Sequence, residues 1–344
     1  MKTTLLSLLL LILFFSMACD DDPISNDDDK LVETLEDYRI AYSTVDNTNS
    51  SIVQTCDIYG NNNQILFENA AIWFAPVDSI VYIQRSEEKT IAYNFYNKKI
   101  VYTFEDEEIS SFWALKIPGK DKVFMGPKSI ERFKPVYIAN LDGTGKSIFS
   151  ENSPGISISF SPDQEKMLLE DELEYKVCNT DGTNKKFIKD LNSINSLDWG
   201  ADSRHLFWSR PMDVNITNIE LLDIETGTSK KLITLDDGVY GVTKISPDGK
   251  KIVFYDKKNN LFMMNADGSD LQTLRTGGKE IKGDRFVYIL EWAPDSRHLL
   301  SSKVLDFENS HIGGALEVID TKTGESTIIH NDDTVISAYW VKVK

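Results

Sequence analysis

The sequence predicts an all-β fold: a seven-bladed β-propeller of four-stranded antiparallel blades over residues 38–344, closed by the C-terminal strand joining the N-terminal blade. Three observations lead to this prediction. One sequence pattern recurs along the chain, its period matches that of a propeller blade, and the pattern begins and ends part-way through a unit. Strand-type periodicity continues throughout, and no helix longer than a turn or two is indicated.

The repeat is clearest in three stretches, which are residues 160–188, 245–274, and 292–303 continued by 315–329. Each begins with an apolar strand, then has a turn such as Pro247-Asp248, a second strand, a variable loop and a third strand. A turn such as Asp267-Gly268 and a short fourth strand complete it. Asp, Asn and Gly favour these turns because their side chains bond local backbone or because they tolerate positive φ. Four antiparallel strands in about 40–45 residues are typical of a propeller blade.

The residues that end the first strands, here called the anchors, give the number of blades. They lie 39 to 48 residues apart, and they are Trp73, Trp113, Phe160, Trp199, Ile245, Trp292 and Trp340. Seven anchors enclose only six full units, so the last anchor needs three more strands. Residues 39–45, 51–60 and 63–67 are predicted to supply strands two, three and four of that blade, and residues 335–343 its first strand. A ring closed in this way has no open sheet edge at its seam.

The anchors and the cysteines carry two further structural predictions. Because tryptophan recurs at one position of the repeat, it is predicted to pack between neighbouring blades, with a sugar-stacking platform as the alternative, and Trp208 is also predicted to be in the core. Cys56 and Cys178 occupy equivalent third-strand positions three blades apart. A disulfide needs Cα atoms within about 7 Å, so both are expected to be free thiols.

The pattern Ser-Pro-Asp-Gly-Lys-Lys-Ile-Val-Phe from residue 246, followed by Met-Asn-Ala-Asp-Gly from residue 264, resembles the TolB-type, WD-like propeller repeat. The resemblance covers about residues 39–344. It implies a propeller fold, a location in the cell envelope, and binding or scaffolding more often than catalysis, with protein partners. The family has no shared catalytic residues to assign to this chain.

The first 18 residues are predicted to be a signal peptide. Lys2 precedes an apolar run from Leu5 to Met17, and these thirteen residues are too few to span a bilayer. With Ala18 and Cys19 the run resembles a bacterial lipoprotein signal, which implies cleavage before Cys19 and lipid attachment to its sulfur. The alternative is an ordinary secretory peptide with an incidental cysteine. A multiply acylated cysteine anchors a protein stably in a membrane.

Residues 19–37 are predicted to form an acidic, flexible tether. They carry nine acidic residues against Lys30, with too little apolar area to fold. Acidic residues directly after the cysteine resemble the surface-export signal of Bacteroidetes-type lipoproteins, whereas in enteric bacteria Asp at this place resembles an inner-membrane retention signal. The first resemblance implies a protein anchored by lipid in the outer membrane, at the cell surface or on the periplasmic face.

Composition and charge exclude several classes of protein. A hydrophobic content of 41% excludes disorder for most of the chain, and the net charge of −17 disfavours nucleic acid and anionic lipid headgroups as partners. Contact with a membrane is therefore expected through the lipid anchor only.

No metal and no cofactor are predicted. His205 and His298 occupy equivalent turn positions in different blades, where exposed turn histidines cannot converge on one ion. Residues 143–147 (GTGKS) end like a phosphate-binding loop but have Asn140 where that loop needs glycine. His311-Ile-Gly-Gly resembles an oxyanion loop, yet no G-x-S-x-G nucleophile motif accompanies it.

Strand alternation predicts where a ligand binds. The first-to-second and third-to-fourth turns of every blade lie at one end, here called the short-turn face. The other two connections vary in length and lie at the opposite end, here called the variable-loop face. Because irregular loops on a rigid scaffold commonly carry function, the candidate ligand contacts are on the variable-loop face, although its loops could equally vary for want of constraint. They are Arg132, Phe133, Lys134, Arg210, Asp213, Lys282, Arg285, Phe286, Asp306 and His311.

The function predicted from these features is that of a lipid-anchored, monomeric propeller. It acts as a non-catalytic binding or interaction scaffold for an envelope protein or polysaccharide. The alternative is an envelope lyase or glycan-processing enzyme that uses the top face of the propeller channel. A converging set of titratable groups in one pocket would favour the enzyme, and a broad polar rim would favour the scaffold.

Overall fold

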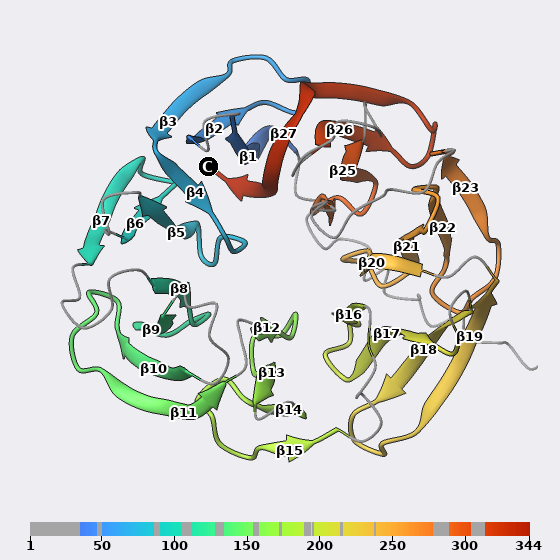
Figure 1. Cartoon of the computed structure of the whole chain (residues 1–344), viewed down its shortest axis with the longest axis horizontal. Helices are drawn as coiled ribbons and strands as arrows, with labels where there is room; N and C mark the ends of the chain where they lie inside the picture. Colours follow the sequence, from blue (N-terminus) through green and yellow to red (C-terminus); the bar gives the residue numbers. More distant parts are fainter. Residues whose placement is uncertain are drawn as a thin grey trace, which may run out of the picture. The chain divides into compact units, whose positions relative to one another are not determined.

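The computed structural model describes residues 35–46, 50–85, 90–104, 112–127, 134–153, 158–171, 174–188, 194, 196–213, 216–236, 239–277, 289–303 and 314–344. The chain divides into two compact units, Met1–Val32 and Glu33–Lys344, and the described residues all belong to the second. In that unit four-stranded antiparallel blades follow one another around a ring (Figure 1). The seven-bladed β-propeller predicted from the repeat is confirmed.

The strands of the first four blades follow the order of the chain. Blade 1 contains β1 (Tyr38–Val45), β2 (Ser51–Cys56) and β3 (Gln64–Glu68) together with the second half of β27. Blade 2 contains β4 (Ala70–Ile72), β5 (Ile80–Arg85), β6 (Thr90–Asn94) and β7 (Lys99–Phe104). Blade 3 contains β8 (Phe112–Lys116), β9 (Lys122–Pro127), β10 (Lys134–Asn140) and β11 (Ser147–Ser153). Blade 4 contains β12 (Ile158–Phe160), β13 (Lys166–Asp171), β14 (Glu174–Asn179) and β15 (Lys186–Phe187).

The remaining blades repeat this arrangement. Blade 5 contains β16 (Ser196–Trp199), β17 (His205–Pro211), β18 (Thr217–Asp223) and β19 (Ser229–Leu235). Blade 6 contains β20 (Val239–Ile245), β21 (Lys251–Asp256), β22 (Leu261–Asn265) and β23 (Gln272–Arg275). Blade 7 contains β24 (Leu290–Trp292), β25 (His298–Lys303), β26 (Gly314–Asp320) and the first half of β27 (Ser326–Lys342). The first strand of each blade is innermost in the ring (Figure 1).

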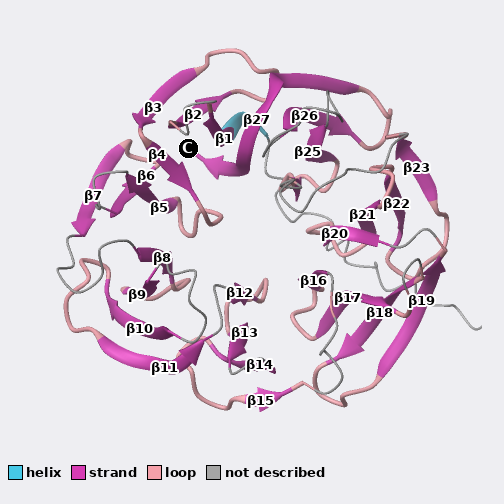
Figure 2. Ribbon diagram, in the orientation of Figure 1, coloured by secondary structure: helices cyan, strands magenta, loops and turns pink. Residues whose placement is uncertain are grey.

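Helix is almost absent from the described part of the chain. Its one helical element is the short 3-10 turn η2 (Leu35–Asp37), next to β1 in Figure 2. Among the described residues, no helix has the length and apolar character that crossing a bilayer requires.

Strand β27 closes the ring. Its first half pairs with β26, as in Val318↔Thr327, and its second half pairs antiparallel with β1 from Tyr38↔Lys342 to Thr44↔Val335. The predicted closure is therefore confirmed, with one difference. The outer strand of blade 7 and the inner strand of blade 1 form one continuous strand, so blades 7 and 1 share a seven-stranded sheet.

The segment that joins the two halves of β27 explains this continuity. Residues 331–334 contain no Gly or Pro, and the backbone stays extended through them. Asp332 Oδ1 lies 2.8 Å from His330 Nε2 and also accepts a hydrogen bond from the Thr334 hydroxyl. These local contacts support an extended backbone at the point where β27 turns from the outside of blade 7 to the inside of blade 1 (Figure 1). The other blades are separated by a break between strands.

The hydrophobic core lies between blades. One cluster, for example, combines Ala41, Val53 and Val341 of blade 1 with Ile72 and Ile83 of blade 2, all of which are fully buried. Each sheet therefore buries its two faces against the sheets on either side, as expected for a repeat fold.

Most anchors pack as predicted. Trp199 and Trp292 are buried, Trp208 is fully buried, and Trp340 is partly buried. Trp113 is also buried, but it does not end its strand as predicted: β8 continues to Lys116, which pairs with Val123 as Trp292 pairs with Leu299.

The prediction is wrong for Trp73, whose side chain is 44% exposed. The register explains the difference: Ile72 pairs with Ile83 as Leu290 pairs with Ser301, so Phe74 occupies the place that Trp292 has in blade 7. Phe74 packs against Trp113 of blade 3, and Trp73 lies on the other side of the chain.

Three anchor tryptophans also form a repeated hydrogen bond between blades. The indole N–H of Trp199 donates to the carbonyl of Ser159 at 3.3 Å. Trp292 donates in the same way to Lys244 at 3.3 Å, and Trp340 to Glu291 at 3.5 Å. Each acceptor precedes the anchor of the previous blade. Since an inner strand has one edge without a partner strand, these bonds satisfy carbonyls that would otherwise lack a partner in the protein.

The first-to-second turns connect neighbouring blades as well. Their fourth residue has positive φ in four blades: Gln164 (64°), Ser203 (56°), Gly249 (72°) and Ser296 (56°). The Ser203 hydroxyl accepts a hydrogen bond from the Asp163 backbone N–H at 2.9 Å, and the Ser296 hydroxyl accepts one from Asp248 N–H at 3.0 Å. A left-handed serine costs about 1–2 kcal/mol, and these hydrogen bonds between blades offset part of that cost.

Cys56 and Cys178 form no disulfide, as predicted, and both are buried. Burial raises the pKa of the Cys56 thiol to about 12. Residues 143–147 lie in the β10–β11 turn and the start of β11, where Gly143 and Gly145 have positive φ. This stretch is therefore a turn between two strands of a blade and not a phosphate-binding loop between a strand and a helix.

We expect removal of residues 335–344 to cause aggregation instead of a moderate loss of stability, because it takes the closing half of β27 away from β1 and opens the ring. Size-exclusion chromatography and circular dichroism of the truncated protein test this. Removal of Lys344 alone, an exposed residue, is the matched control and should leave a folded monomer. A truncated protein that stays monomeric and folded would contradict the closure.

We expect the Cys56 thiol to resist modification in the native protein. The variant Cys19→Ser/Cys178→Ala leaves Cys56 as its only cysteine. At pH 8 its reaction with an aromatic disulfide reagent should be at least about 100-fold slower in the folded than in the urea-unfolded protein, because the thiolate is the nucleophile and burial disfavours it. Equal rates in the two states would show that the thiol is accessible.

Candidate functional site

The structure describes three of the ten ligand contacts predicted on the variable-loop face. Lys134 begins β10, Arg210 lies near the end of β17, and Asp213 follows that strand. The Arg210 guanidinium lies 5.8 Å from the centre of the Trp208 ring. The other seven contacts, and the predicted lipidation site, lie outside the described residues: Arg132, Phe133, Lys282, Arg285, Phe286, Asp306, His311 and Cys19. A ligand at the variable-loop face stays a prediction.

A cavity of about 850 Å³ opens on the short-turn face. It is lined by Tyr38, Arg39 and Tyr59 of blade 1, Lys98 of blade 2 and His298 of blade 7, and by both ends of the propeller at Leu35 and Lys344. We call it the chain-end cavity. No signal in the sequence marks this cavity, because residues from three blades meet there only when the ring closes.

Two turns of equivalent position shape the cavity and its surroundings. In blade 1 the Asp57 carboxylate accepts hydrogen bonds from the backbone N–H groups of Tyr59 (2.9 Å) and Asn61 (2.8 Å). In blade 2 the Asn94 side chain accepts from the N–H groups of Tyr96 (2.9 Å) and Asn97 (3.1 Å). The first residue of each turn thus holds the backbone, as Asx turns do. The tyrosine two residues later occupies the tip.

The tip position differs between blades. In the third-to-fourth turns of blades 3 to 7 it is occupied by Asp142, Asp181, Glu225, Asp267 and Lys322. Three of these carboxylates support their own turns: Asp142 accepts from Thr144 N–H at 3.0 Å, and Asp181 and Asp267 make the equivalent bond at 2.9 Å. Tyr59 and Tyr96 are 66% and 62% exposed, so their rings contribute little packing to the fold.

Trp73 is a third exposed aromatic residue at the same end of the molecule. It follows β4 at the start of the first-to-second turn of blade 2, and its carbonyl accepts a hydrogen bond from the Tyr339 hydroxyl at 3.2 Å. Tyr59, Trp73 and Tyr96, here called the aromatic group, therefore lie on the short-turn ends of two neighbouring blades. The signal of Tyr59 and Tyr96 in the sequence is an aromatic residue at a turn tip where the other five blades have a charged residue.

The chain-end cavity is balanced in charge. Three basic residues (Arg39, Lys98, Lys344) and three acidic residues (Glu36, Asp57, Asp295) line it, together with His298. Two of the carboxylates are used within their turns. Asp57 holds the tip of blade 1, and Asp295 accepts from His298 N–H at 3.0 Å and lies 2.6 Å from its Nδ1. Arg39 donates through Nη2 to the carbonyl of Asn62 at 2.5 Å.

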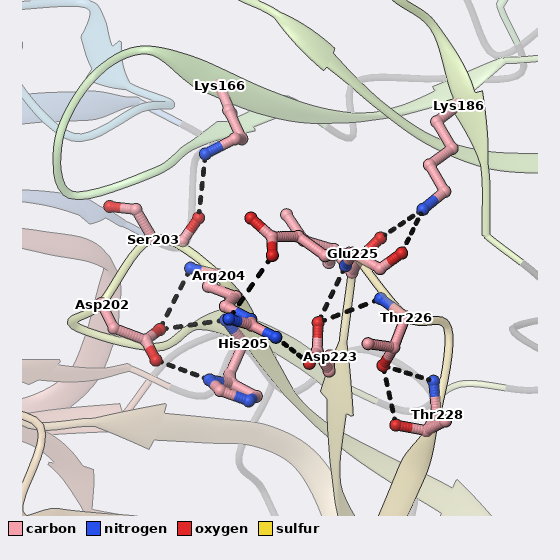
Figure 3. A network of polar contacts seen from close by, with 11 residues as sticks. Lys166, Lys186, Asp202, Ser203, Arg204, His205, Asp223, Glu225, Thr226 and Thr228 are labelled. Atoms are coloured by element: carbon pink, nitrogen blue, oxygen red, sulfur yellow. Dashed lines mark hydrogen bonds and ion pairs between the residues drawn. The ribbon is translucent and has the colours of Figure 1, made fainter.

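A second cavity, of about 480 Å³, lies on the short-turn face between blades 5 and 6. Its wall includes Asp202 and His205 of the network shown in Figure 3. Asp202 Oδ1 accepts from the N–H groups of Arg204 and His205 at 3.0 Å, and Oδ2 lies 2.5 Å from His205 Nδ1. Burial of Asp202 raises its pKa, but these bonds outweigh burial and the pKa is lowered overall.

The same network recurs in blade 7 and supports the turns. Arg204 pairs with Asp223 at 2.6 Å, and Arg297 pairs with Asp320 at 2.5 Å. The arginine hydrogen bonds hold the pKa of both partner carboxyls well below the ordinary range. The histidines of these turns were expected to be exposed. They are instead partly buried, with 29% of the His205 and 20% of the His298 side chain exposed, because each ring bonds the aspartate of its own turn.

Inner strands of four consecutive blades carry a polar cluster beside the axis of the ring. Asp198, Lys244, Glu291 and Tyr339 each precede an anchor residue. Lys244 Nζ lies 3.4 Å from Glu291 Oε1, and the two side chains are 28% and 32% exposed. Asp198 Oδ2 accepts from the Ile245 backbone N–H at 3.1 Å, which links blade 5 to blade 6.

Burial and mutual attraction shift the pKa values of this cluster. Desolvation raises the pKa of Asp198 and of Glu291, although the nearby Lys244 acts in the opposite direction. The Glu291 carboxylate, opposed by desolvation, raises the pKa of Lys244. One cation thus interacts with two carboxylates between the inner strands.

A buried polar cluster supports the base of the variable-loop face between blades 6 and 7. Arg275, at the end of β23, donates to the Ser301 hydroxyl at 3.0 Å and to the Ser302 carbonyl at 3.1 Å, and it pairs with Glu317. Glu317 is 1% exposed, and the Tyr255 hydroxyl lies 2.9 Å from Ser301 Oγ. These contacts fix the strand ends from which two of the predicted binding loops begin.

Comparison with known proteins identifies the fold alone. No protein family model matches the chain. No curated protein matches it either. Among solved structures, TolB from Acinetobacter baumannii has a TM-score of 0.54 at 15% identity, over 88% of this chain and 66% of the TolB chain. The tricorn protease has a TM-score of 0.51 at 12% identity, over 82% of this chain and 34% of that one. A chain of the mitotic checkpoint complex has a TM-score of 0.51 at 13% identity, over 76% of this chain and 85% of that chain.

This chain is therefore a β-propeller that resembles those of TolB and the tricorn protease in structure. It spans just under two thirds of the TolB chain and about a third of the tricorn chain. At these identities the likeness extends to the arrangement of the strands and no further.

We expect Lys244→Met to destabilise the fold by about 1–3 kcal/mol at pH 7. Removing one partner of a fully buried ion pair costs about 3–5 kcal/mol. The Lys244 and Glu291 side chains are 28% and 32% exposed, so solvent screening reduces this cost. Without the cation the raised pKa values of Asp198 and Glu291 rise further, so the folded state binds protons that the unfolded chain has released. The loss relative to the parent should therefore shrink as the pH falls from 7 toward 5.

Urea denaturation of both proteins at several pH values measures this difference. Lys250→Met is the matched control, because its side chain is 76% exposed and its removal should change stability by less than about 0.5 kcal/mol. A loss in Lys244→Met that stays constant with pH would contradict the coupling of the three charges.

Proposed function

We propose that this protein is a lipid-anchored, monomeric outer-membrane protein whose propeller binds an envelope protein or polysaccharide without catalysis. The observation that carries the proposal is the chain-end cavity, which is lined by Tyr59 and by Lys98 of the turn that carries Tyr96. Its volume of about 850 Å³ is within the range of ligand sites, and the surrounding turns are held by several hydrogen bonds each. Exposed aromatic rings on rigid turns can bind a partner with little loss of conformational entropy.

The state of the carboxylates supports binding over catalysis. Asp57 and Asp295 already accept two backbone N–H bonds each, and Asp295 also bonds the His298 ring. Groups committed to holding a turn are poorly suited to transferring protons during a reaction, since catalysis would break the turn that positions them. The rest of the polar lining combines the Glu36 carboxylate, the Tyr59 hydroxyl and the ammonium groups of Lys98 and Lys344, a mixture that suits recognition.

The proposed anchor fits the position of the site. The acidic tether joins the propeller at η2, and Leu35 of η2 lines the chain-end cavity. With lipid on Cys19, the tether would reach the propeller at the short-turn face. A partner bound there would then be held close to the point of attachment.

Metabolic labelling with an alkyne-bearing palmitate tests the anchor. We expect the full-length protein to be labelled and to fractionate with the outer membrane, and Cys19→Ser to lose both properties. A label retained in Cys19→Ser, or an unlabelled parent protein, would overturn the proposed lipidation.

Chemical footprinting tests the binding face. Purified protein is oxidised with hydroxyl radicals, alone and with the separated protein and polysaccharide fractions of the envelope, and the modified residues are located by mass spectrometry. We expect protection of Tyr59, Trp73 and Tyr96 by at least one fraction, with Phe187, an exposed aromatic residue of blade 4, as an unprotected internal control. Binding that survives Tyr59→Ala/Tyr96→Ala and is lost in Lys134→Glu/Arg285→Glu would place the site on the variable-loop face instead.

A further inference from the structure

We propose that the ligand of the chain-end cavity and the aromatic group is a polysaccharide built of uncharged sugar rings. This inference rests on the proposed function and names the ligand class of the same site. It is carried by exposed tyrosines at the turn tips of two neighbouring blades, where four of the other five blades have an acidic residue. Tyr59 lines the cavity, as does Lys98 of the Tyr96 turn, and the lining holds equal numbers of basic and acidic side chains.

The tyrosines are not explained by the needs of the fold. Asp57 and Asn94 hold their two turns, and the rings of Tyr59 and Tyr96 remain about two-thirds exposed. A polar tip serves a blade turn equally well, as Glu225 and Lys322 show in turns that are held by Asp223 and Asp320. Large exposed rings on a structure that does not require them indicate a partner that covers them.

The character of the surface favours sugar over protein. An exposed apolar residue at or next to the start of the outer strand occurs in blades 1 to 4, 6 and 7: Ile65, Ile100, Ile148, Phe187, Leu271 and Ile328. Exposure at that position is therefore a property of the repeat, and the three aromatic residues at other positions are what distinguishes blades 1 and 2. A protein interface would need an apolar core depleted in charge, whereas this cavity has six charged residues among its lining.

Charge balance favours an uncharged ligand. Arg39, Lys98 and Lys344 oppose Glu36, Asp57 and Asp295 in the lining, so neither an anionic nor a cationic polymer gains a net attraction. Hydroxyl groups of a sugar can both donate and accept hydrogen bonds and so match a wall of mixed polarity. Aromatic rings meanwhile cover the apolar faces of sugar rings, as expected for residues with an apolar body and a polar tip.

The arrangement also favours a polymer over a single sugar. The three aromatic residues lie on three separate turns of two blades, and the cavity continues from blade 1 toward blade 7. A chain that lies along the two tyrosine turns can contact Tyr96, Tyr59 and the cavity at the same time, because Lys98 of the Tyr96 turn and Tyr59 both line the cavity. Several weak contacts then add within one ligand.

Affinity electrophoresis tests the inference. The full-length protein is run in native gels that contain laminarin, galactomannan, amylopectin, dextran or arabinoxylan, with polygalacturonate as the anionic comparison. We expect retardation by at least one of the neutral polymers and none by polygalacturonate. Tyr59→Ala/Tyr96→Ala should weaken the apparent affinity at least tenfold, and Trp73→Ala should weaken it as well.

Two matched variants separate ring stacking from a change in fold. Phe187→Ala removes an exposed aromatic residue from blade 4 and should bind like the parent. Tyr59→Phe/Tyr96→Phe keeps the rings and should retain most of the affinity. Thermal unfolding of all variants should stay within about 2 °C of the parent, since the altered side chains are largely exposed.

The possible failures can be told apart. The inference is overturned if no neutral polymer retards the protein, if only polygalacturonate does, or if the alanine variants bind like the parent. If, in addition, the protein fraction of the envelope protects the aromatic group in the footprint, the ligand is a protein and the proposed binding site survives. If neither fraction protects it, the proposed function fails as well.

Discussion

The pairing of β1 with β27 is the constraint on which the rest of the ring depends. Each blade buries its faces only against its two neighbours, so blade 1 is stable only if both neighbours are present. The pairing from Tyr38↔Lys342 to Thr44↔Val335 joins the first and last described strands of the chain and thereby supplies the missing neighbour. It also creates the chain-end cavity, since Leu35, Asp295 and Lys344 come together only in the closed ring.

Contacts between blades have a common design that serves this closure. Anchor tryptophans donate to the inner strand of the preceding blade, and Ser203 and Ser296 accept from the preceding first-to-second turn. Asp198 and Lys244 add charged links between inner strands. Near the axis each inner strand has one edge without a partner strand, and side chains of the neighbouring blade make hydrogen bonds to the backbone there. The hydrogen bonds of Ser203 and Ser296 between blades come with local backbone strain, because both serines have positive φ.

The sequence was sufficient for the fold because its signals are local and repeated. Anchor spacing and turn residues such as Asp248 and Gly249 gave the blades and their number. Trp73 was misjudged because spacing does not reveal the register that places Phe74 at the anchor position. The continuity of β27 was missed because its linker contains no Gly or Pro and so leaves no turn signal. The chain-end cavity depends on which turns meet after closure, a long-range property. An alignment of the turn tips would have singled out Tyr59 and Tyr96. It would not have shown that their turns border the cavity.

The antiparallel register of β1 and β27 has a mechanical consequence. Tyr38 and Lys342 are paired at one end of the two strands, so the ends of the propeller leave from the same side. A force that pulls these ends apart loads the hydrogen bonds one pair at a time, in the manner of a zipper, and meets far less resistance than a force applied along the strands would. A load carried by the N-terminal end alone, with Lys344 unattached, does not act across this weak line.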